Sequence, residues 1–271
     1  MKKEMKKHKN RRRGKPNRPH STAPEKKLAT ANIYGSHAVQ AAWMNEERRI
    51  DHLYCTANAL DGFGETLKKA QGRDLMRPEP IILDKAQLDK TVPPGAVHQG
   101  LALACGELPE IGLEDILIRE RDAQHSVMII LDQVTDPHNV GAILRSACAF
   151  GAHGLVMQKK HAPALTGVLA KTACGAIEHV PVTYETNLSR SIETLQEQGY
   201  FVYGLDERGE DITQQNTAGK SALVLGAEGP GLRRLVKEHC DSLIRLPMHG
   251  PMPSINVSNA AAVALYEFSK S

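Results

Sequence analysis

The sequence predicts an α/β protein with two folded parts, and two patterns of apolar residues support that fold class. After residue 127, strand-like apolar segments alternate with helix-like segments, which is typical of a mostly parallel sheet with helices on both faces. A shorter run of alternating segments precedes this region, and a charged stretch separates the two. We therefore expect a small α/β domain at residues 31–108, a linker at 109–126 and a larger domain at 127–271.

The small domain is predicted from short segments with distinct patterns. Helical patterns occur in SHAVQAAWMN and GETLKKAQ, whereas RIDHLYCTA, PIILD and HQGLALACGEL have extended patterns. Residues 109–126 carry many charges and lack a sustained β pattern, which favours a linker there.

The large domain is predicted from a longer alternation of the same kind. Strands are expected at VMIILDQV, GLVMQ, HVPVTY, YFVYGLD, SALVLGAE and LIRLPM. Helices are expected at NVGAILRSACAF, APALTGVLAKTA, LSRSIETLQEQG, GLRRLVKEHC and an Ala-rich segment that ends at Phe268. Ligands of open parallel sheets usually bind beyond the carboxyl ends of the strands, so the functional residues are expected there.

The chain of 271 residues has a net charge of +3, but the charge is divided unevenly. Residues 1–27 contain twelve Lys or Arg and two Glu, which leaves 22 basic and 29 acidic residues in the rest of the chain. A tail at 1–30 with so few apolar residues is predicted to be disordered alone and to bind nucleic acid. The alternatives are a solvated tail that aids solubility and, less favoured, a mitochondrial transit peptide, which would be amphipathic and poorer in Lys.

The sequence disfavours several common classes of protein and site. The five cysteines are scattered and form no C-x-x-C pair, so we expect no disulfide framework, no zinc site and a reducing compartment. No apolar run approaches the roughly 20 residues of a membrane helix, and no secretory signal is present, which predicts a cytoplasmic protein without membrane contact. GAEGPG and AGKS match neither the dinucleotide nor the P-loop pattern, and the twelve histidines lack the spacing of metal ligands.

Arg145 is the only formal charge within PHNVGAILRSACAFGAHG. On a helix from Val140 to Phe150 the apolar side chains share one face, and Arg145 points away from it. Its neighbours one turn away are the small residues Gly141, Ala142, Cys148 and Ala149. An ordinary solvent-facing Arg is one interpretation, but a guanidinium among small residues also suits a bidentate grip on a phosphate. Upstream, Asn139 can cap the helix or orient a substrate.

Two further polar groups follow predicted strands. Glu228 comes directly after an apolar strand and lies between glycines that let a ligand approach the backbone. It either stabilises a helix N-terminus or places a carboxylate at the carboxyl end of a strand. The loop before the last helix contains Ser254, Asn256, Ser258 and Asn259, more polar groups than one helix cap requires. The last helix has a face of mostly small apolar residues, which predicts close packing against the body or a second subunit.

Together, DPHNVGAILRSACAFG, LVLGAEGPGL and IRLPM followed by SINVSNAAAVALYE resemble the three ordered motifs of the SpoU/TrmH family of RNA 2′-O-ribose methyltransferases. NIYGSHAVQAAW with HQGLAL resembles the family's small RNA-binding domain, and the layout is most similar to the ribosomal RNA branch. Ile255 and Asn259 stand where Leu and an apolar residue are commoner.

The resemblance implies a trefoil knot in the C-terminal segments of the parallel sheet, a topology that general rules treat as nearly absent. It also implies S-adenosylmethionine as the cofactor, bound in the knot chiefly by backbone groups. A homodimer is implied as well, with the site completed across the interface. The residues expected to bind the cofactor are Leu225, Gly226, Leu246 and Ile255.

By the same resemblance, Arg145 is the central catalytic residue. The residues expected to place the substrate and this Arg are Asn139, Glu228, Ser254 and Asn256. Arg145 is expected to clamp a phosphate and polarise the ribose hydroxyl rather than act as a base, because a guanidinium with a pKa above about 12 seldom gives up its proton.

The expected function is transfer of a methyl group from S-adenosylmethionine to a ribose 2′-hydroxyl of RNA, with ribosomal RNA favoured. The residues expected to contact RNA are His98, Gln99, Gly100 and Arg145. The alternatives are a tRNA 2′-O-methyltransferase, a methyltransferase that acts on a base or a protein, and a non-enzymatic RNA-binding or ribosome-assembly protein on the same fold.

Overall fold

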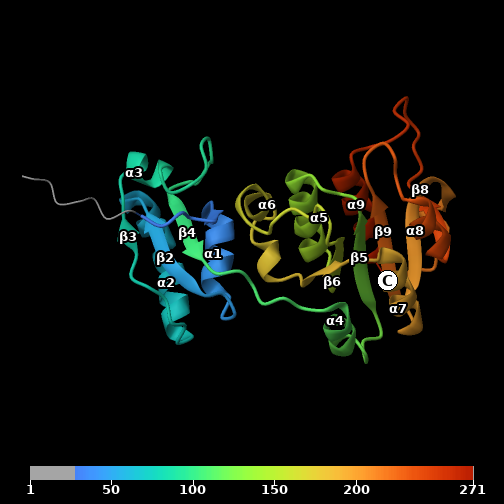
Figure 1. Cartoon of the computed structure of the whole chain (residues 1–271), viewed down its shortest axis with the longest axis horizontal. Coiled ribbons are helices and arrows are strands. Elements are labelled where there is room, and N and C mark those ends of the chain that lie inside the picture. Colours follow the sequence, from blue (N-terminus) through green and yellow to red (C-terminus); the bar gives the residue numbers. More distant parts are fainter. Residues whose placement is uncertain (1–27, 271) are drawn as a thin grey trace, which may run out of the picture.

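The computed structural model describes residues 28–270, which form two sheets that lie side by side with their helices (Figure 1). The N-terminal unit contains β1 to β4, and the C-terminal unit runs from α4 to α9. Residues 1–27 of the predicted basic tail lie outside the described residues. Within residues 28–270, none of the helices combines the length and apolar character that a membrane crossing requires.

The N-terminal unit has the strand order β1-β4-β2-β3, in which β4 runs antiparallel to β1 and β2, and β3 runs parallel to β2. Its elements are β1 (Ile33–Tyr34), α1 (Ser36–Met44), β2 (Ile50–Cys55), α2 (Ala57–Gly72), β3 (Ile81–Ile82), α3 (Lys85–Asp89) and β4 (Leu101–Cys105). The sequence pattern does not predict β1 or α3, because both are too short to show a period.

The C-terminal unit has the strand order β10-β8-β9-β5-β6-β7, and its strand pairs are parallel. Its first elements are α4 (Leu113–Arg119), β5 (Ser126–Asp132), α5 (Pro137–Ala149), β6 (Gly154–Gln158), α6 (Gly167–Thr172), the 3₁₀ helix η1 (Ala176–Glu178) and β7 (Val182–Glu185). The remainder are α7 (Leu188–Glu197), β8 (Phe201–Asp211), η2 (Ile212–Gln214), β9 (Lys220–Gly226), α8 (Arg234–His239), β10 (Ser242–Arg245) and α9 (Val257–Phe268). The predicted fold class is thus confirmed.

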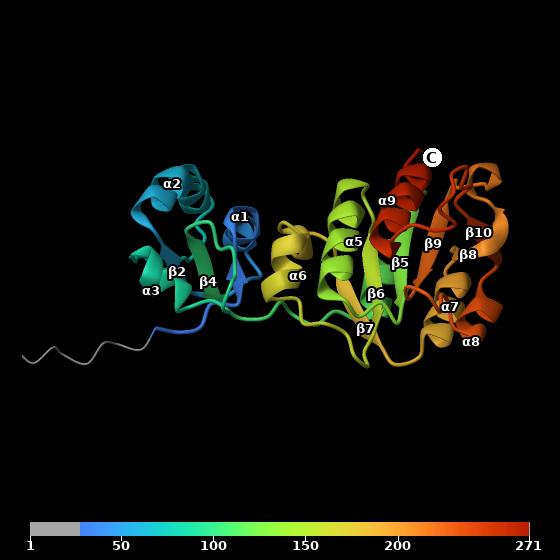
Figure 2. The same cartoon turned by 90° about the horizontal axis from the view of Figure 1, so that it is seen from above.

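Helices cover both faces of the large sheet, and alternate side chains of β5 pack into the two resulting cores. Ile129 and Leu131 belong to a core with α5 and α9, whereas Met128 and Ile130 belong to a second core with α4 and α7. Figure 2 shows α5 and α9 on one side of the strands and α7 and α8 on the other. Successive side chains of a strand point to opposite faces, so a strand buried on both sides is apolar throughout.

Helix α5 begins two residues earlier than the predicted segment NVGAILRSACAF. Pro137 is its first residue, where a fixed φ and a missing N–H are tolerated. The Asp136 side chain caps it by accepting a hydrogen bond of 3.1 Å from the backbone N–H of His138. The suggestion that Asn139 caps this helix is therefore wrong. Asn139 lies inside the first turn, and its side chain is available for other contacts.

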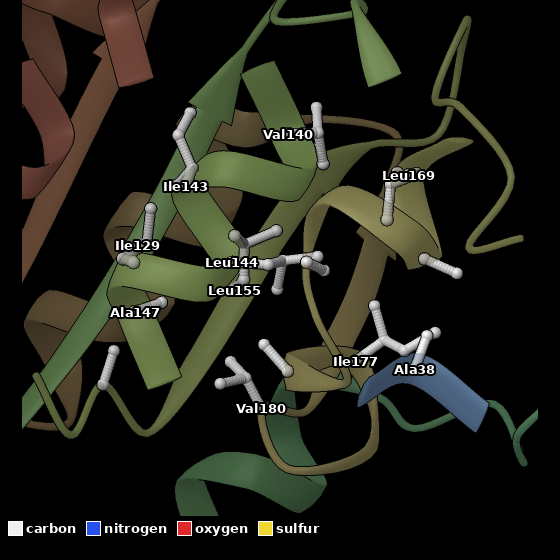
Figure 3. Close-up of a cluster of buried hydrophobic side chains, with 14 of the residues drawn as sticks. Ala38, Ile129, Val140, Ile143, Leu144, Ala147, Leu155, Leu169, Ile177 and Val180 are labelled. Atoms are coloured by element: carbon white, nitrogen blue, oxygen red, sulfur yellow. The ribbon is translucent and has the colours of Figure 1, made fainter. Parts of the chain in front are cut away.

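The two units share one apolar core rather than meeting at a polar surface. Figure 3 shows Ala38 of α1 beside Ile177, with Leu169 of α6 close by. Gly175 has φ +93°, and a Cβ there would lie 2.5 Å from the Cβ of Ala41, so only glycine allows this approach of α1.

A buried ion pair closes the same junction. The Arg48 guanidinium donates to both carboxylate oxygens of Glu178, at 3.2 and 2.6 Å, and to the carbonyl of Gly106 at 2.9 Å. Asn45 donates a further hydrogen bond of 2.8 Å to Glu178. The two charged side chains are only 3% and 0% exposed, so each depends on the other for its charge balance.

Two segments differ from the predicted elements. The predicted linker at 109–126 contains α4, whose Leu113, Ile116 and Leu117 are buried against the large sheet. Helix α8 begins at Arg234 rather than at Gly231, because Ala227 and Gly231 form an antiparallel bridge that holds the preceding residues in a turn.

Candidate active site

The three sequence motifs meet in a ring of hydrogen-bonded side chains, the polar ring, formed by Asn139, Glu228 and Asn256. Asn139 Nδ2 donates to Glu228 Oε1 at 3.2 Å, and Asn256 Nδ2 donates to Asn139 Oδ1 at 3.0 Å and also to Glu228 Oε1. The ring is accessible: Glu228 and Asn256 are exposed and Asn139 is half-buried. Residues 28–270 contain no group of three or more His, Cys, Asp or Glu arranged to hold a metal ion, and the ring offers only hydrogen-bonding groups.

Each member of the ring is positioned by the end of an element of the large sheet. Asn139 lies in the first turn of α5, just beyond β5, and Glu228 follows β9, the direct neighbour of β5. Asn256 is the N-cap of α9, and its Oδ1 accepts from Ser258 N at 2.8 Å. Because β5 and β9 are parallel, their carboxyl ends lie at one edge of the sheet, where the ring is found.

The turn that presents Glu228 depends on Gly226. A Cβ at Gly226 would lie 2.2 Å from the backbone carbon of Gly231, which leaves no room for any other residue. The sequence predicts that these glycines admit a ligand, but the space beside Gly226 holds the chain's own turn. Glu228 follows at the exposed tip of that turn.

Arg145 lies on the same helix as Asn139 but apart from the ring. Six helical residues separate the two by about 9 Å along the axis and about 120° around it. Arg145 is exposed, and within residues 28–270 it forms no hydrogen bond or ion pair. Burial raises the pKa of the nearby Cys148 thiol, so at neutral pH that sulfur stays protonated and supplies no nucleophile.

The loop from Leu246 to Asn256 contains Ser254, which is exposed and makes no side-chain hydrogen bond in the described part of the chain. The loop follows β10 and leads into α9. Across residues 247–255, no backbone hydrogen bond to another described residue occurs. The loop therefore presents free backbone donors and acceptors next to the ring.

The residues expected to hold S-adenosylmethionine lie around this loop. Leu225 is buried at the end of β9, Gly226 and Leu246 are half-buried, and Ile255 is exposed, as is Met252 in the same loop. Free backbone groups next to partly exposed apolar side chains suit a ligand with a flat apolar ring and several polar groups. These residues therefore fit an adenosyl compound.

A second carboxylate lies at the same edge, and this one is buried and was not predicted from the sequence. Asp132 is the last residue of β5, its side chain is fully buried, and it accepts from Arg233 Nε at 2.6 Å and from Arg233 N at 2.8 Å. The signal in the sequence is a charged residue at the end of the apolar run VMIILD. A carboxylate buried so deeply requires a cationic partner, which is Arg233.

The predicted RNA contacts at residues 98–100 have structural partners. The His98 ring is buried, with Nε2 2.9 Å from Asp89 Oδ1 and Nδ1 accepting from Gly100 N at 3.0 Å. Gln99 Oε1 accepts from the backbone N of Ser36 at 3.1 Å and so caps α1. These bonds give the loop a role in the architecture of the N-terminal unit, and its contact with RNA remains a prediction.

Both units match known families. Residues 126–266 match the SpoU rRNA methylase family, and residues 32–110 match the domain described as RNA 2′-O ribose methyltransferase substrate binding. The chain belongs to the SpoU rRNA methylase family. The polar ring of this SpoU family member joins the three motifs on which the resemblance was based, and that resemblance is confirmed.

Relatives of this SpoU family member extend over most of its length. The Vibrio cholerae serotype O1 protein named 23S rRNA (guanosine-2′-O-)-methyltransferase RlmB is 40% identical over 252 residues, which cover 87% of this chain and 94% of the relative. The protein of the same name from Pseudomonas putida is 38% identical over 240 residues, with the same coverage of both chains.

A solved structure shares the fold of this SpoU family member. The SpoU methyltransferase AviRb from Streptomyces viridochromogenes, solved in complex with AdoMet, aligns with a TM-score of 0.70 over 88% of each chain. At 21% sequence identity this likeness concerns the fold alone.

Proposed function

We propose that this protein transfers a methyl group from S-adenosylmethionine to the 2′-hydroxyl of a guanosine in 23S ribosomal RNA. The observation that carries the proposal is the polar ring, in which one side chain from each family motif meets the other two at an accessible edge. The relatives with 38–40% identity carry the name of this activity.

The reaction is an in-line displacement. The ribose 2′-oxygen forms a bond to the methyl carbon while the carbon–sulfur bond breaks, S-adenosylhomocysteine leaves with the bonding electron pair, and the hydroxyl proton passes to solvent water. S-adenosylmethionine, when bound, supplies a methyl group on a positively charged sulfur. The protein must then align the acceptor oxygen with the methyl group. Such alignment can lower the activation free energy by several kcal/mol.

The polar ring supports a positioning role for Glu228. Its Oε1 accepts from both Asn139 and Asn256, whereas Oε2 has no partner among the described residues. Two neutral amides orient the carboxylate without neutralising its charge. Oε2 is therefore available to a ribose hydroxyl or to a guanidinium, with Ser254 as a further polar group in the loop beside it.

Arg145 is proposed as the catalytic residue that holds a phosphate of the substrate and polarises the ribose hydroxyl. Within one chain, Arg145 and the polar ring lie on different sides of α5. We therefore propose a homodimer in which Arg145 of one copy reaches the polar ring of the other copy across the interface. The surface around Arg145 supports a dimer interface there. The neighbouring residues of α5 are small, and the adjacent helix α9 exposes the apolar side chains of Val263 and Tyr266.

S-adenosylmethionine is proposed to bind along Leu225, Gly226, Leu246 and Ile255. By family resemblance, the C-terminal segments that hold these residues are proposed to form the trefoil knot. A cytoplasmic location is proposed because ribosomal RNA is the substrate. The basic tail is proposed to strengthen RNA binding, so removal of residues 1–27 would flatten the salt dependence of that binding.

The test is a map of 2′-O-methyl positions in RNA from cells with and without this chain. A 2′-O-methyl group blocks alkaline cleavage at that nucleotide, so one site in 23S rRNA should become sensitive when the chain is absent. A lost 2′-O-methyl group on tRNA would support the tRNA alternative, and labelled methyl groups that reach a base or a protein instead of a ribose would support the other. Unchanged methylation throughout, with defective ribosome assembly, would support a non-enzymatic role.

A further inference from the structure

We infer that a cationic track beside the polar ring binds the phosphates of RNA that flank the target nucleotide. This inference rests on the proposed function and adds a binding subsite to it. The cationic track is defined by Lys160, His161, Arg233 and Arg234. These side chains line two adjoining hollows at the carboxyl edge of the large sheet.

The two hollows share Arg233 and together run along the edge from β9 to β7. The first has a volume of about 600 Å³ and is lined by residues after β5, β6 and β9, including Thr135, Lys160 and Ala227. The second, of about 350 Å³, lies where β7 passes into α7, at Thr186 and Asn187. Ala227 precedes Glu228 in the chain, so the track begins next to the ring.

The charge of this track opposes that of the rest of the chain. Residues 28–271 contain 22 basic and 29 acidic residues, yet neither hollow is lined by an Asp or a Glu. By contrast, the hollow of about 940 Å³ between the two units is lined by six carboxylates, among them Glu107, Glu110 and Asp115, and by three Lys or Arg, so carboxylates predominate there. A polyanion would therefore be attracted to the carboxyl edge and repelled from the junction.

Arg233 is oriented for a ligand by a buried partner. Its Nε and backbone N bind the fully buried Asp132, and its side chain is 39% exposed. Its two Nη groups make no hydrogen bond or ion pair within the described residues, and they form the planar fork that suits phosphate oxygens. Arg234 pairs with Glu238 on an exposed face, an interaction weak enough for a phosphate to replace.

The test compares Lys160→Gln combined with Arg234→Gln against a matched control, Arg121→Gln. Lys160 is exposed and has no partner in the described part of the chain, so the double variant should fold. Arg121 is an exposed Arg at the amino edge, where its carbonyl accepts from Lys220 at the start of β9. Arg233→Lys is the third variant, because it keeps the charge beside Asp132 but removes the fork.

Binding of a fluorescein-labelled single-stranded oligoribonucleotide is measured by anisotropy over a series of KCl concentrations. The double variant should weaken binding about tenfold or more and flatten the salt slope by about 1.4, since each lost phosphate contact contributes about 0.7. Arg233→Lys should weaken binding severalfold, and Arg121→Gln should match the wild type. S-adenosylmethionine affinity, measured by calorimetry, should be unchanged in all variants.

Equal RNA binding by the double variant and by Arg121→Gln would contradict the proposal that the cationic track binds RNA. A loss of S-adenosylmethionine affinity in Arg233→Lys would also contradict the proposal, because the hollow lined by Arg233 would then bind the methyl donor and not RNA. Methyl transfer to transcribed 23S rRNA is followed separately. If the wild type transfers none but the binding differences persist, the proposed function fails while the track stands.

Discussion

Glu178 and Glu228 are both held by nitrogen donors, yet their surroundings are opposite. The Glu178 side chain is fully buried at the junction of the units, where a guanidinium and an amide occupy both of its oxygens. Glu228 is exposed at the carboxyl edge, and among the described residues only the amides of Asn139 and Asn256 bond to it, through one oxygen.

The difference separates residues that hold the fold from residues that act on a ligand. A buried carboxylate needs a full counter-charge, and once it is paired neither of its oxygens is free to bind a ligand. An exposed carboxylate oriented by neutral amides keeps its charge and one free oxygen. We therefore expect changes at the junction to alter stability, and changes at the carboxyl edge to alter catalysis.

The largest effect is expected at the junction. Glu178→Ala leaves the Arg48 guanidinium buried without a counter-charge, which should lower the free energy of unfolding by about 3–5 kcal/mol. The measurement is urea unfolding followed by circular dichroism. The control Glu47→Ala, a nearby exposed carboxylate, should stay within about 0.5 kcal/mol of the wild type. A small effect of Glu178→Ala would contradict the contrast drawn between the two glutamates.

The next effect is expected at Arg145, which is exposed and has no hydrogen-bond or ion-pair partner among residues 28–270 of its own chain. Arg145→Ala should lower kcat for methyl transfer by about 10² to 10³, the usual loss when one stabilising donor is removed from a transition state. Its unfolding free energy and its affinity for S-adenosylmethionine should be those of the wild type. Retained turnover in this variant would remove Arg145 from the mechanism.

A smaller effect is expected for Glu228→Gln, which preserves the shape of the polar ring but removes its charge. We expect kcat to fall about tenfold, because the ring orients the reactants and can still form hydrogen bonds. Thermal unfolding should not change. Comparison with Asn139→Asp, which adds a second carboxylate beside Glu228, sharpens the test. If the charge of Glu228 is irrelevant, Glu228→Gln will match the wild type.

The smallest effect is a pH dependence at Asp206, whose carboxylate is bonded to Lys237. Burial raises the pKa of Asp206, but the hydrogen bonds from Lys237 and from the backbone N–H of Arg208, together with the positive charges of these two residues, outweigh it and hold the pKa below the ordinary value of 3.8. Its contribution to stability is therefore complete above 3.8 and is lost as the pH falls through the lower value of the folded state. Asp206→Asn should remove this part of the acid sensitivity, measured as urea midpoints from pH 5 to pH 3.

Local patterns in the sequence determined the fold class, the apolar face of α5 and the identity of the family. The residues that bury α5, such as Ile143 and Ala147, lie within one or two turns of each other, so their period is visible in the chain. The same holds for the uniformly apolar β5. The knot and the boundaries of the domains remain predictions from resemblance and composition.

Only the tertiary structure decided which polar groups meet. Asn139 and Asn256 are 117 residues apart and join because β9 lies beside β5 and α9 begins at the same edge. Arg48 and Glu178 are 130 residues apart, and Asp132 and Arg233 are 101 apart. A periodic pattern reports only on neighbours within a helix or strand, whereas these pairs depend on strand order and on how the units dock. The cap of α5 is different, because Asp136 forms it through a local bond to the N–H of His138, which leaves Asn139 free for the ring.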